Sequence, residues 1–272
     1  MATTIFLVNP REGAVTPPSY LLDTYSAAAA YSLRQLKTGV TSVVRVRRSS
    51  DNREANFTPT EITDGTLTGF CGGGDGFVVT WYDQSGNSND ATQSTAASQP
   101  QIVSSGSLIA TAGGNYGVDF DGSNDRITLG TPISTTQLFY STSVFERLTS
   151  GIRSIPFGRT TTSNNTPFWW NPTNGIYSNM TTQNLHDSSQ TQTGEFLQTS
   201  LRDSSNNLKY WLNALAGTIK TYANGTGQLD SIGSMTTLYH NGIICEAIYF
   251  NDDQESNRTA IESDINGHYS IY

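Results

Sequence analysis

The segment 81–93, WYDQSGNSNDATQ, concentrates residue types that recognise small molecules. It joins the aromatic pair Trp81 and Tyr82 to two carboxylates, several side-chain amides and a glycine. This composition is typical of a sugar pocket, a calcium loop or a tight turn, since all three need polar atoms held by a bent backbone. The residue types alone leave these three alternatives open.

A second stretch, FWWNPTNGIY at 168–177, has the composition of a sugar-binding surface. An aromatic ring can cover the apolar C–H face of a sugar while polar side chains fix its hydroxyl groups. If the stretch forms a hairpin, its adjacent tryptophans face opposite sides of the sheet, so one fills the core. The other is free to stack on a sugar or to cover a subunit interface. The candidate carbohydrate-binding residues are Trp169, Trp170, Asn171 and Tyr177.

The acidic spacing in DFDGSND, residues 119–125, is similar to the start of a calcium loop. An EF-hand loop needs glycine at its sixth position and glutamate at its twelfth, but Asn124 and Gly130 stand there. We favour a turn whose side chains bond their own backbone, with calcium in another geometry as the alternative. No metal site and no cofactor is predicted.

Other catalytic constellations are not recognisable. His186, His240 and His268 lie in loop-like or terminal contexts without a Gly-x-Ser-x-Gly elbow. Glu246, within the apolar run GIICEAIYF, is either a catalytic acid or, as we favour, a structural acid. Cys71 and Cys245 are too few for a disulfide framework and are interpreted as buried small hydrophobic residues, with a bridge between them as the alternative.

Short strands must position most of these residues. In TSVVRVRRSS, valines alternate with Arg45 and Arg47, which predicts a strand with one solvated face. A hairpin is predicted within 195–222, with turn chemistry at Asp203 to Asn207. Further strands are predicted in GFVVTWYD, YGVDFDGSNDRITLG, QLFYSTSVFERL and GIICEAIYF.

One helix is predicted on each side of the strands. In YLLDTYSAAAAYSLRQLKTG, four alanines and near-helical apolar spacing predict a helix from about Ser26 to Gly39. The second occupies the closing residues 251–272, capped by Asp252 or Asp253.

The predicted fold class is all-β, an antiparallel jelly-roll sandwich with these two helices. It forms one domain over residues 20–272, preceded by an arm at 1–19 whose prolines disfavour regular structure.

Charge excludes one class of partner. The 272 residues include 15 basic and 23 acidic side chains, so the formal charge is -8. Without a cationic surface to neutralise phosphates, nucleic acid is not an expected partner. The apolar run near Met1 follows no basic region, so no secretory signal is expected. Membrane insertion is not expected either, because no apolar stretch approaches about 20 residues.

Four stretches together resemble the concanavalin A-like lectin/glucanase sandwiches, in the laminin-G-like form found in phage and bacterial surface proteins. They are WYDQSGNSNDATQ, GVDFDGSNDRITLG, RDSSNNLKYWLNALAG and GIICEAIYFNDDQESNRTAIESDIN. Their order and spacing also match, over most of 20–272. The opening AAAAYSLRQL with VVRVRRSSDN resembles domains of phage virion and tail proteins. It is also similar to the catalytic domain of α-L-arabinofuranosidase B, which carries a close YDQSGN-N segment.

The arabinofuranosidase resemblance implies a nucleophilic glutamate on a mid-domain strand, an acid/base aspartate before the last strand, and a vicinal cysteine pair that touches the sugar. Here the mid-domain stretch TPFWWNPTNGIYSNM has no carboxylate. In DSIGSMTTLYHNG, the segment before the last strand, the only carboxylate is that of Asp230. No two cysteines are adjacent. Since glycoside hydrolysis usually needs two placed carboxylates, we expect no catalytic residues and a protein that is not an enzyme.

The same resemblance makes WYDQSGN a marker of the fold. It implies that Trp81 lies in or near the core, and that Asp83, Ser85, Asn87 and Asn89 form a turn. It also implies that Glu246 lies on the outward side of the last strand.

The resemblance to virion domains implies a phage structural protein, a head decoration or tail-associated protein on the virion surface. Its arm at 1–19 would contact other virion proteins, and the sandwich would face host surface glycans. A homo-oligomer, a trimer, is expected on the same basis. The alternative is a carbohydrate-active enzyme of the arabinofuranosidase B type or a free carbohydrate-binding lectin.

Overall fold

The computed structural model describes residues 19–135, 138–148, 153–161, 166–171, 175–179, 183–188, 192–221 and 227–272. For part of the segment 166–188 only the backbone is described, and the side chains of Trp169 and Asn171 lie outside the described set. The predicted arm also lies outside it, except for Ser19.

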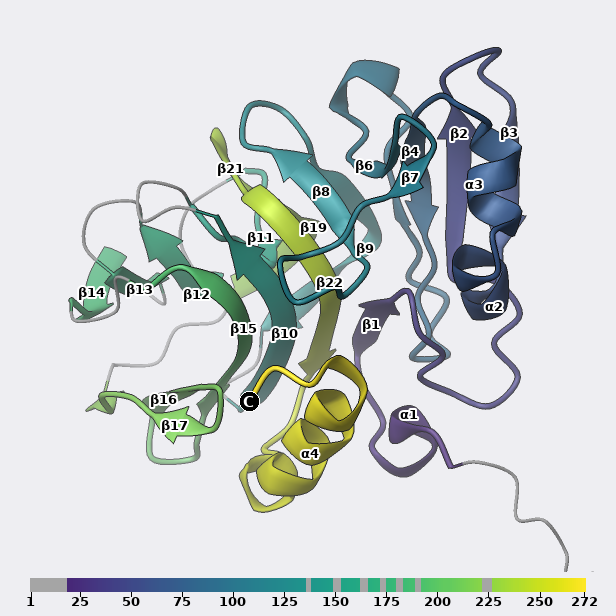
Figure 1. The fold of residues 1–272 in the computed structure, drawn as a ribbon. Helices are drawn as coiled ribbons and strands as arrows, with labels where there is room; N and C mark the ends of the chain where they lie inside the picture. Colours follow the sequence, from purple (N-terminus) through teal and green to yellow (C-terminus); the bar gives the residue numbers. More distant parts are fainter. Residues whose placement is uncertain are drawn as a thin grey trace, which may run out of the picture.

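Most of the described chain is in strands, with few helices (Figure 1). The helices are α1 (Leu21–Thr24), α2 (Pro59–Thr63), α3 (Thr66–Cys71) and α4 (Arg258–Tyr269), with short 3-10 turns η1 (Ala96–Ser98) and η2 (Glu255–Asn257). The strands are β1 (Ala29–Ser32), β2 (Val44–Arg48), β3 (Glu54–Phe57), β4 (Gly76–Trp81), β5 (Ala91–Thr92), β6 (Gln101–Ser104), β7 (Ser107–Leu108), β8 (Val118–Asp121), β9 (Ile127–Thr135), β10 (Phe139–Arg147), β11 (Phe157–Gly158), β12 (Thr166–Asn171), β13 (Gly175–Asn179), β14 (Gln183–Asp187), β15 (Gly194–Arg202), β16 (Asn207–Leu212), β17 (Leu215–Ala216), β18 (Lys220–Thr221), β19 (Gly227–Ile232), β20 (Ser234–Met235), β21 (Leu238–Tyr239) and β22 (Asn241–Phe250).

Strand β22 lies at the centre of a large antiparallel sheet. One edge of β22 pairs with β10, which continues through β15 to β16. The other edge is shared by β8, along Asn241–Ile244, and β1, along Glu246–Tyr249. Beyond β8 the sheet continues through β6 and β4 to β2 and β3. The predicted all-β antiparallel sandwich is confirmed.

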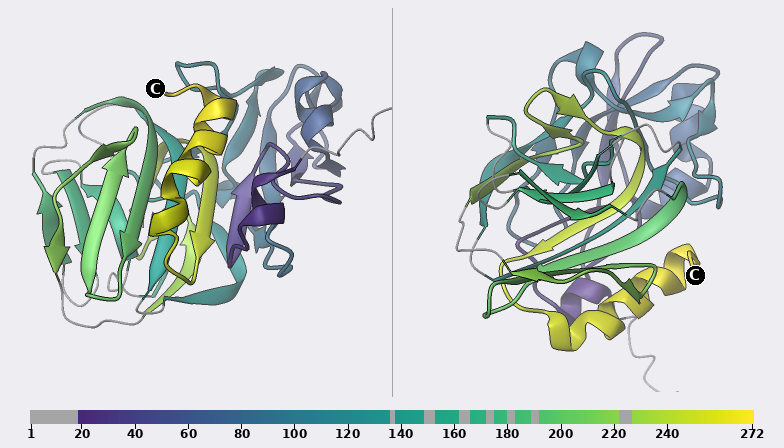
Figure 2. Two further views of the ribbon diagram at one scale, coloured as in Figure 1. Left: turned by 90° about the horizontal axis from the view of Figure 1, so that it is seen from below. Right: turned by 90° about the vertical axis from the view of Figure 1, so that its left-hand side faces the viewer.

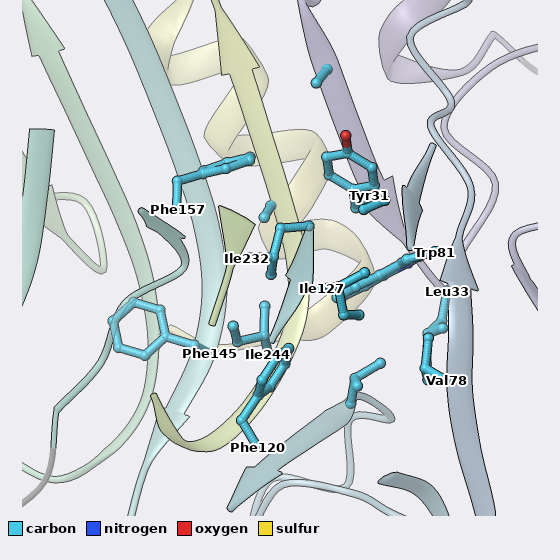
Figure 3. Packing of buried hydrophobic residues seen from close by; sticks show 14 of the residues in the cluster. Tyr31, Leu33, Val78, Trp81, Phe120, Ile127, Phe145, Phe157, Ile232 and Ile244 are labelled. Carbon is cyan, nitrogen blue, oxygen red and sulfur yellow. The ribbon is translucent and has the colours of Figure 1, made fainter. Parts of the chain in front are cut away.

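The main core lies between this sheet and the strands β5, β9, β19 and β11, which pair in that order from β4. Figure 3 shows Ile127 of β9 and Ile232 of β19 near Phe145 and Ile244 of β10 and β22. All four side chains are fully buried. Strand β9 alternates buried and exposed residues, so one of its faces builds the core, whereas β10 and β22 are buried along almost their whole length.

Helix α4 covers the outer face of the same sheet (Figure 2). Its Ile261 and Ile265, four residues apart, are buried in a second cluster with Tyr140, Val144 and Ile248 from β10 and β22. The predicted C-terminal helix is therefore confirmed, although its predicted caps are wrong. Its N-cap is Asn257, because η2 intervenes. None of the helices in the described ranges is long and apolar enough to span a membrane.

The helix predicted from Ser26 to Gly39 is wrong. Residues 29–32 form β1, which pairs with β22, and only the single turn α1 is helical in this region. All four residues of β1 are buried. Helix propensity is a weak preference, and pairing with the central strand overrides it here.

Two short helices, α2 and α3, were not predicted. The start of α2 carries a recognisable signal, a capping box in which Thr58 and Glu61 bond each other's backbone, with Pro59 at the first helical position. Cys71 at the end of α3 and Cys245 in β22 are both buried and free, which confirms their interpretation as buried hydrophobic residues.

Candidate functional site

The segment 81–93 is a structural corner, as predicted. Trp81 is fully buried, and the carboxylate of Asp83 accepts four hydrogen bonds. These come from the N–H groups of Ala30, Ser85 and Asn89 and from the hydroxyl of Ser85, at 2.7–3.0 Å. With its acceptor sites occupied by neighbouring groups, Asp83 fixes the bend and joins it to β1.

The residues 119–125 form the predicted turn. Asp121 Oδ1 accepts hydrogen bonds from the N–H groups of Ser123 and Asn124, and Asp125 accepts one from the N–H of Asp121. Burial, opposed by this last bond, raises the pKa of Asp125 to about 6. In the described part of the chain, no group of three or more His, Cys, Asp and Glu side chains is placed to hold a metal ion.

The predicted tryptophan hairpin exists as β12 and β13, with Trp169 opposite Tyr177. Trp170 is the tryptophan that fills the core. Its ring packs on Phe196 at 5.2 Å between centroids, and its Nε1 donates to Gln198. Its ring is therefore closed to a sugar, which corrects its place among the candidate contacts.

The other candidate residues of this hairpin are Tyr177, Trp169 and Asn171. Tyr177 is half-buried against the small cluster of Ile155 and Met235. For Trp169 and Asn171, whose side chains lie outside the described residues, a sugar contact stays a prediction.

Glu246 is a satisfied structural acid, as favoured from the sequence. Its side chain is 0% exposed and accepts hydrogen bonds from Nε and Nη2 of Arg34 at 2.8 and 3.2 Å. Tyr269 also donates to it at 3.3 Å. A β-bulge precedes Glu246, because Val144 lies opposite Glu246 whereas Phe145 lies opposite Ile244.

A pocket of about 440 Å³ opens beside this ion pair and is called here the Tyr116 pocket. Tyr116 is an exposed aromatic residue, with 41% of its surface accessible. Around it lie groups able to bond hydroxyls, the amides of Gln35 and Asn115 and the imidazole of His268. The lining is completed by Leu33, Arg34, Pro59, Thr60, Ile62, Thr63, Gly114 and Tyr269. An aromatic face next to a few placed polar groups is the arrangement that sugar recognition requires.

Arg34 and His268 set the electrostatics of the Tyr116 pocket. Arg34 contacts Glu246 on one side and Asp264 of α4 on the other, with Nη1 2.8 Å from Asp264 Oδ1. Burial, helped by the charge of Arg34, lowers the pKa of His268 although Glu246 and Asp264 oppose the shift. At neutral pH the imidazole is thus uncharged, and it can accept or donate a hydrogen bond.

Two further glutamates lie opposite each other under the loop that leads to the Tyr116 pocket. Glu146 of β10 and Glu195 of β15 are direct cross-strand partners. Glu146 accepts the N–H of Ala112, and Glu195 accepts from the hydroxyl of Thr111 and the amide of Asn115, each at 2.9 Å. Burial and, less strongly, Glu146 raise the pKa of Glu195 against the effect of these bonds. These hydrogen bonds anchor the loop at residues 111–115 to β10 and β15.

Asp230 and His240, two further candidates from the sequence, also have structural roles. Both carboxylate oxygens of Asp230 accept hydrogen bonds from Thr160. His240 is fully buried and accepts the N–H of Ile155 at Nδ1, while burial lowers its pKa to about 3. Neither group lines the Tyr116 pocket.

No family model and no curated protein matches the sequence. Among solved structures, a mutant GH54 α-L-arabinofuranosidase soaked with 4-nitrophenyl α-L-arabinofuranoside matches with a TM-score of 0.63 and 14% identity, over 88% of this chain and 62% of that chain. An arabinofuranosidase complexed with arabinofuranosyl-α-1,2-xylobiose matches with a TM-score of 0.59, at the same identity and coverage. A Trypanosoma rangeli sialidase matches with a TM-score of 0.47 and 10% identity, over 90% and 38% of the two chains.

The two arabinofuranosidase matches overturn the expectation that the protein is not an enzyme. Both structures are of glycoside hydrolases with this fold, and the loss of the expected motif residues does not exclude hydrolysis by other residues. The chain spans 62% of the length of the arabinofuranosidase chains. At 14% identity, the likeness establishes that this chain has the β-sandwich fold of the GH54 arabinofuranosidase structures.

Proposed function

We propose that the protein is a carbohydrate-active β-sandwich that binds a sugar in the Tyr116 pocket. The observation that carries this proposal is the exposed ring of Tyr116 beside the hydrogen-bonding side chains of Gln35, Asn115 and His268. The sugar-directed neighbours with the same fold support it.

Replacing Tyr116 with alanine is expected to weaken glycan binding at least about fivefold, since an aromatic contact contributes roughly 1 kcal/mol beyond the area it buries. The binding partner is first found on a glycan array that includes arabinofuranosyl and xylosyl oligosaccharides, and affinities are then measured by calorimetry. Tyr272→Ala is the matched control, because Tyr272 is 51% exposed and lies outside the pocket. Equal binding by the wild type and Tyr116→Ala would contradict the assignment, and loss in Trp169→Ala alone would favour the hairpin instead.

Glycoside hydrolysis is the second candidate, favoured by the opposed pair Glu146 and Glu195 next to the pocket. Glycosidases use one carboxyl group as an acid, and the raised pKa of Glu195 suits that role. We expect release of nitrophenol from 4-nitrophenyl α-L-arabinofuranoside, and a loss of about 100-fold or more in Glu195→Gln. Glu54→Gln, distant on β3, is the control. Unchanged turnover in Glu195→Gln would exclude this pair as the catalytic residues.

A role on a phage particle is a further proposal and rests on the sequence resemblance. In it, residues 1–19 attach the sandwich to other virion proteins, the assembly is a homo-oligomer, and the Tyr116 pocket faces host glycans. Deleting residues 1–19 is expected to abolish attachment to the particle and to leave a folded, soluble domain. Particle sedimentation followed by blotting measures attachment, and circular dichroism checks the fold. Decoration by the truncated chain would disprove the anchoring role.

A further inference from the structure

We infer that the Tyr116 pocket selects sugars by charge, accepting uncharged sugars and rejecting those that carry a carboxylate. The inference rests on the proposed function and adds the class of ligand. It follows from how the one permanent cation among the described lining residues, Arg34, is already committed.

The positive charge of Arg34 is paired with two carboxylates. Its Nε and Nη2 donate to Glu246, and its Nη1 lies 2.8 Å from Asp264. The side chain of Arg34 is only 13% exposed and that of Glu246 is fully buried, so water does not screen this pair fully. A guanidinium forks onto a carboxylate through two parallel hydrogen bonds. For Arg34, that fork is already occupied by Glu246.

The other elements around the pocket add acidic groups. Helix α4 contributes Asp264, which is paired with Arg34, and the uncharged His268, which lines the Tyr116 pocket. Strand β15 contributes Glu195, which accepts the side-chain amide of Asn115. Helix α2 carries Glu61, whose carboxylate caps its own helix by accepting the N–H of Thr58. At the ion pair itself two carboxylates, Glu246 and Asp264, face the single guanidinium of Arg34. An anionic ligand therefore meets repulsion that no free basic group of the lining offsets.

Sugar hydroxyl groups match the hydrogen-bonding side chains of the Tyr116 pocket better than a carboxylate does. A hydroxyl can donate to the side-chain oxygens of Gln35 and Asn115, and it can also accept from His268. A carboxylate only accepts, so it would leave these oxygens without a donor. Charge and hydrogen-bond chemistry therefore favour the same class of ligand.

The test compares each neutral oligosaccharide that binds on the glycan array with the same oligosaccharide in which one sugar unit carries a carboxylate, for example galacturonate in place of galactose or glucuronate in place of glucose. We expect the full-length protein to bind the neutral member at least tenfold more tightly at low ionic strength, with the ratio falling as salt is added. Asp264→Asn removes one acidic group, and is expected to reduce this ratio several-fold. Asp253→Asn, an exposed acid that accepts the N–H of Glu255 and is not paired with Arg34, is expected to leave the ratio unchanged.

The outcomes separate the two proposals. If no oligosaccharide on the glycan array binds, the sugar-binding function fails. If both members bind with equal affinity, or if Asp264→Asn leaves the ratio unchanged, the charge selection is wrong while sugar binding stands. Because the readout is a ratio, a general loss of stability in a variant does not imitate the expected result.

Discussion

Replacing Glu246 with alanine is expected to lower the free energy of unfolding by about 3 kcal/mol, the lower end of the range for broken buried ion pairs. The substitution leaves Arg34, only 13% exposed, without its main partner. The effect stays at the lower end because Asp264 still neutralises part of the charge. Urea denaturation of the two proteins at pH 7 measures the difference.

The control for this result is a pair on the surface. Arg45 and Glu54 are joined at 2.7 Å, with side chains 44% and 31% exposed. Because water screens such a pair, Glu54→Ala is expected to cost less than about 1 kcal/mol. If Glu246→Ala lowered the free energy of unfolding no more than Glu54→Ala does, the buried pair would not contribute the stability that its geometry indicates.

Stability is expected to fall by about 3 kcal/mol between pH 7 and pH 4 because of His240 alone. Burial lowers the pKa of His240 from 6.5 to about 3. In this interval the unfolded chain binds a proton that the folded chain refuses, so acid favours unfolding. The contribution of uncharged His240 to the free energy of unfolding is fully present above pH 6.5 and is lost as the pH falls towards 3.

His240→Asn is the variant that isolates this effect. The amide oxygen of asparagine can take the place of Nδ1 and accept the N–H of Ile155, yet it does not titrate. Urea denaturation at pH 7 and pH 4 should therefore show a flatter pH dependence in the variant. Asp125, with its raised pKa, has the opposite dependence, but it is present in both proteins and cancels. His268→Asn is the comparison variant. The pKa of His268 is also lowered by burial, but Glu246 and Asp264 oppose that shift, so a smaller flattening is expected there. An equal flattening would refute the assignment to His240.

Local pattern was enough to predict several of the strands, such as β2, β15 and β16. Val44 and Val46 are buried in β2 while Arg45 is exposed, as their alternation requires. The hairpin of β15 and β16 turns where Asp203 accepts the N–H groups of Ser205 and Asn207. In both cases the residues that decide the structure are close neighbours in the sequence.

Long-range pairing defeated the prediction for the alanine-rich segment. Its four alanines favour a helix locally, but Ala29 lies opposite Tyr249 and Ala30 opposite Ile248. The sequence contains no local sign of that partner. The helix α2 is a different case, since the Thr58 and Glu61 capping box could have been recognised.

The Tyr116 pocket could not be found from the sequence for the same reason. Its lining comes from four separate segments, 33–35, 59–63, 114–116 and 268–269. None of them is a motif, and Tyr116 stands alone among glycines and polar residues. The tryptophan segment was predicted as a binding surface because its aromatic residues are adjacent in sequence. One of them, Trp170, is buried in the core.

The Arg34–Glu246 pair also constrains when this chain can fold. Its partners are 212 residues apart, and within the described ranges β22 is the strand that β1 pairs with. During synthesis, β1 and Arg34 leave the ribosome long before the residues that will hold them, so the central sheet stays incomplete until β22 has emerged. Such distant pairing slows folding, and the unpaired edges of the early strands are exposed meanwhile. A chain interrupted before β22 would therefore be prone to aggregation.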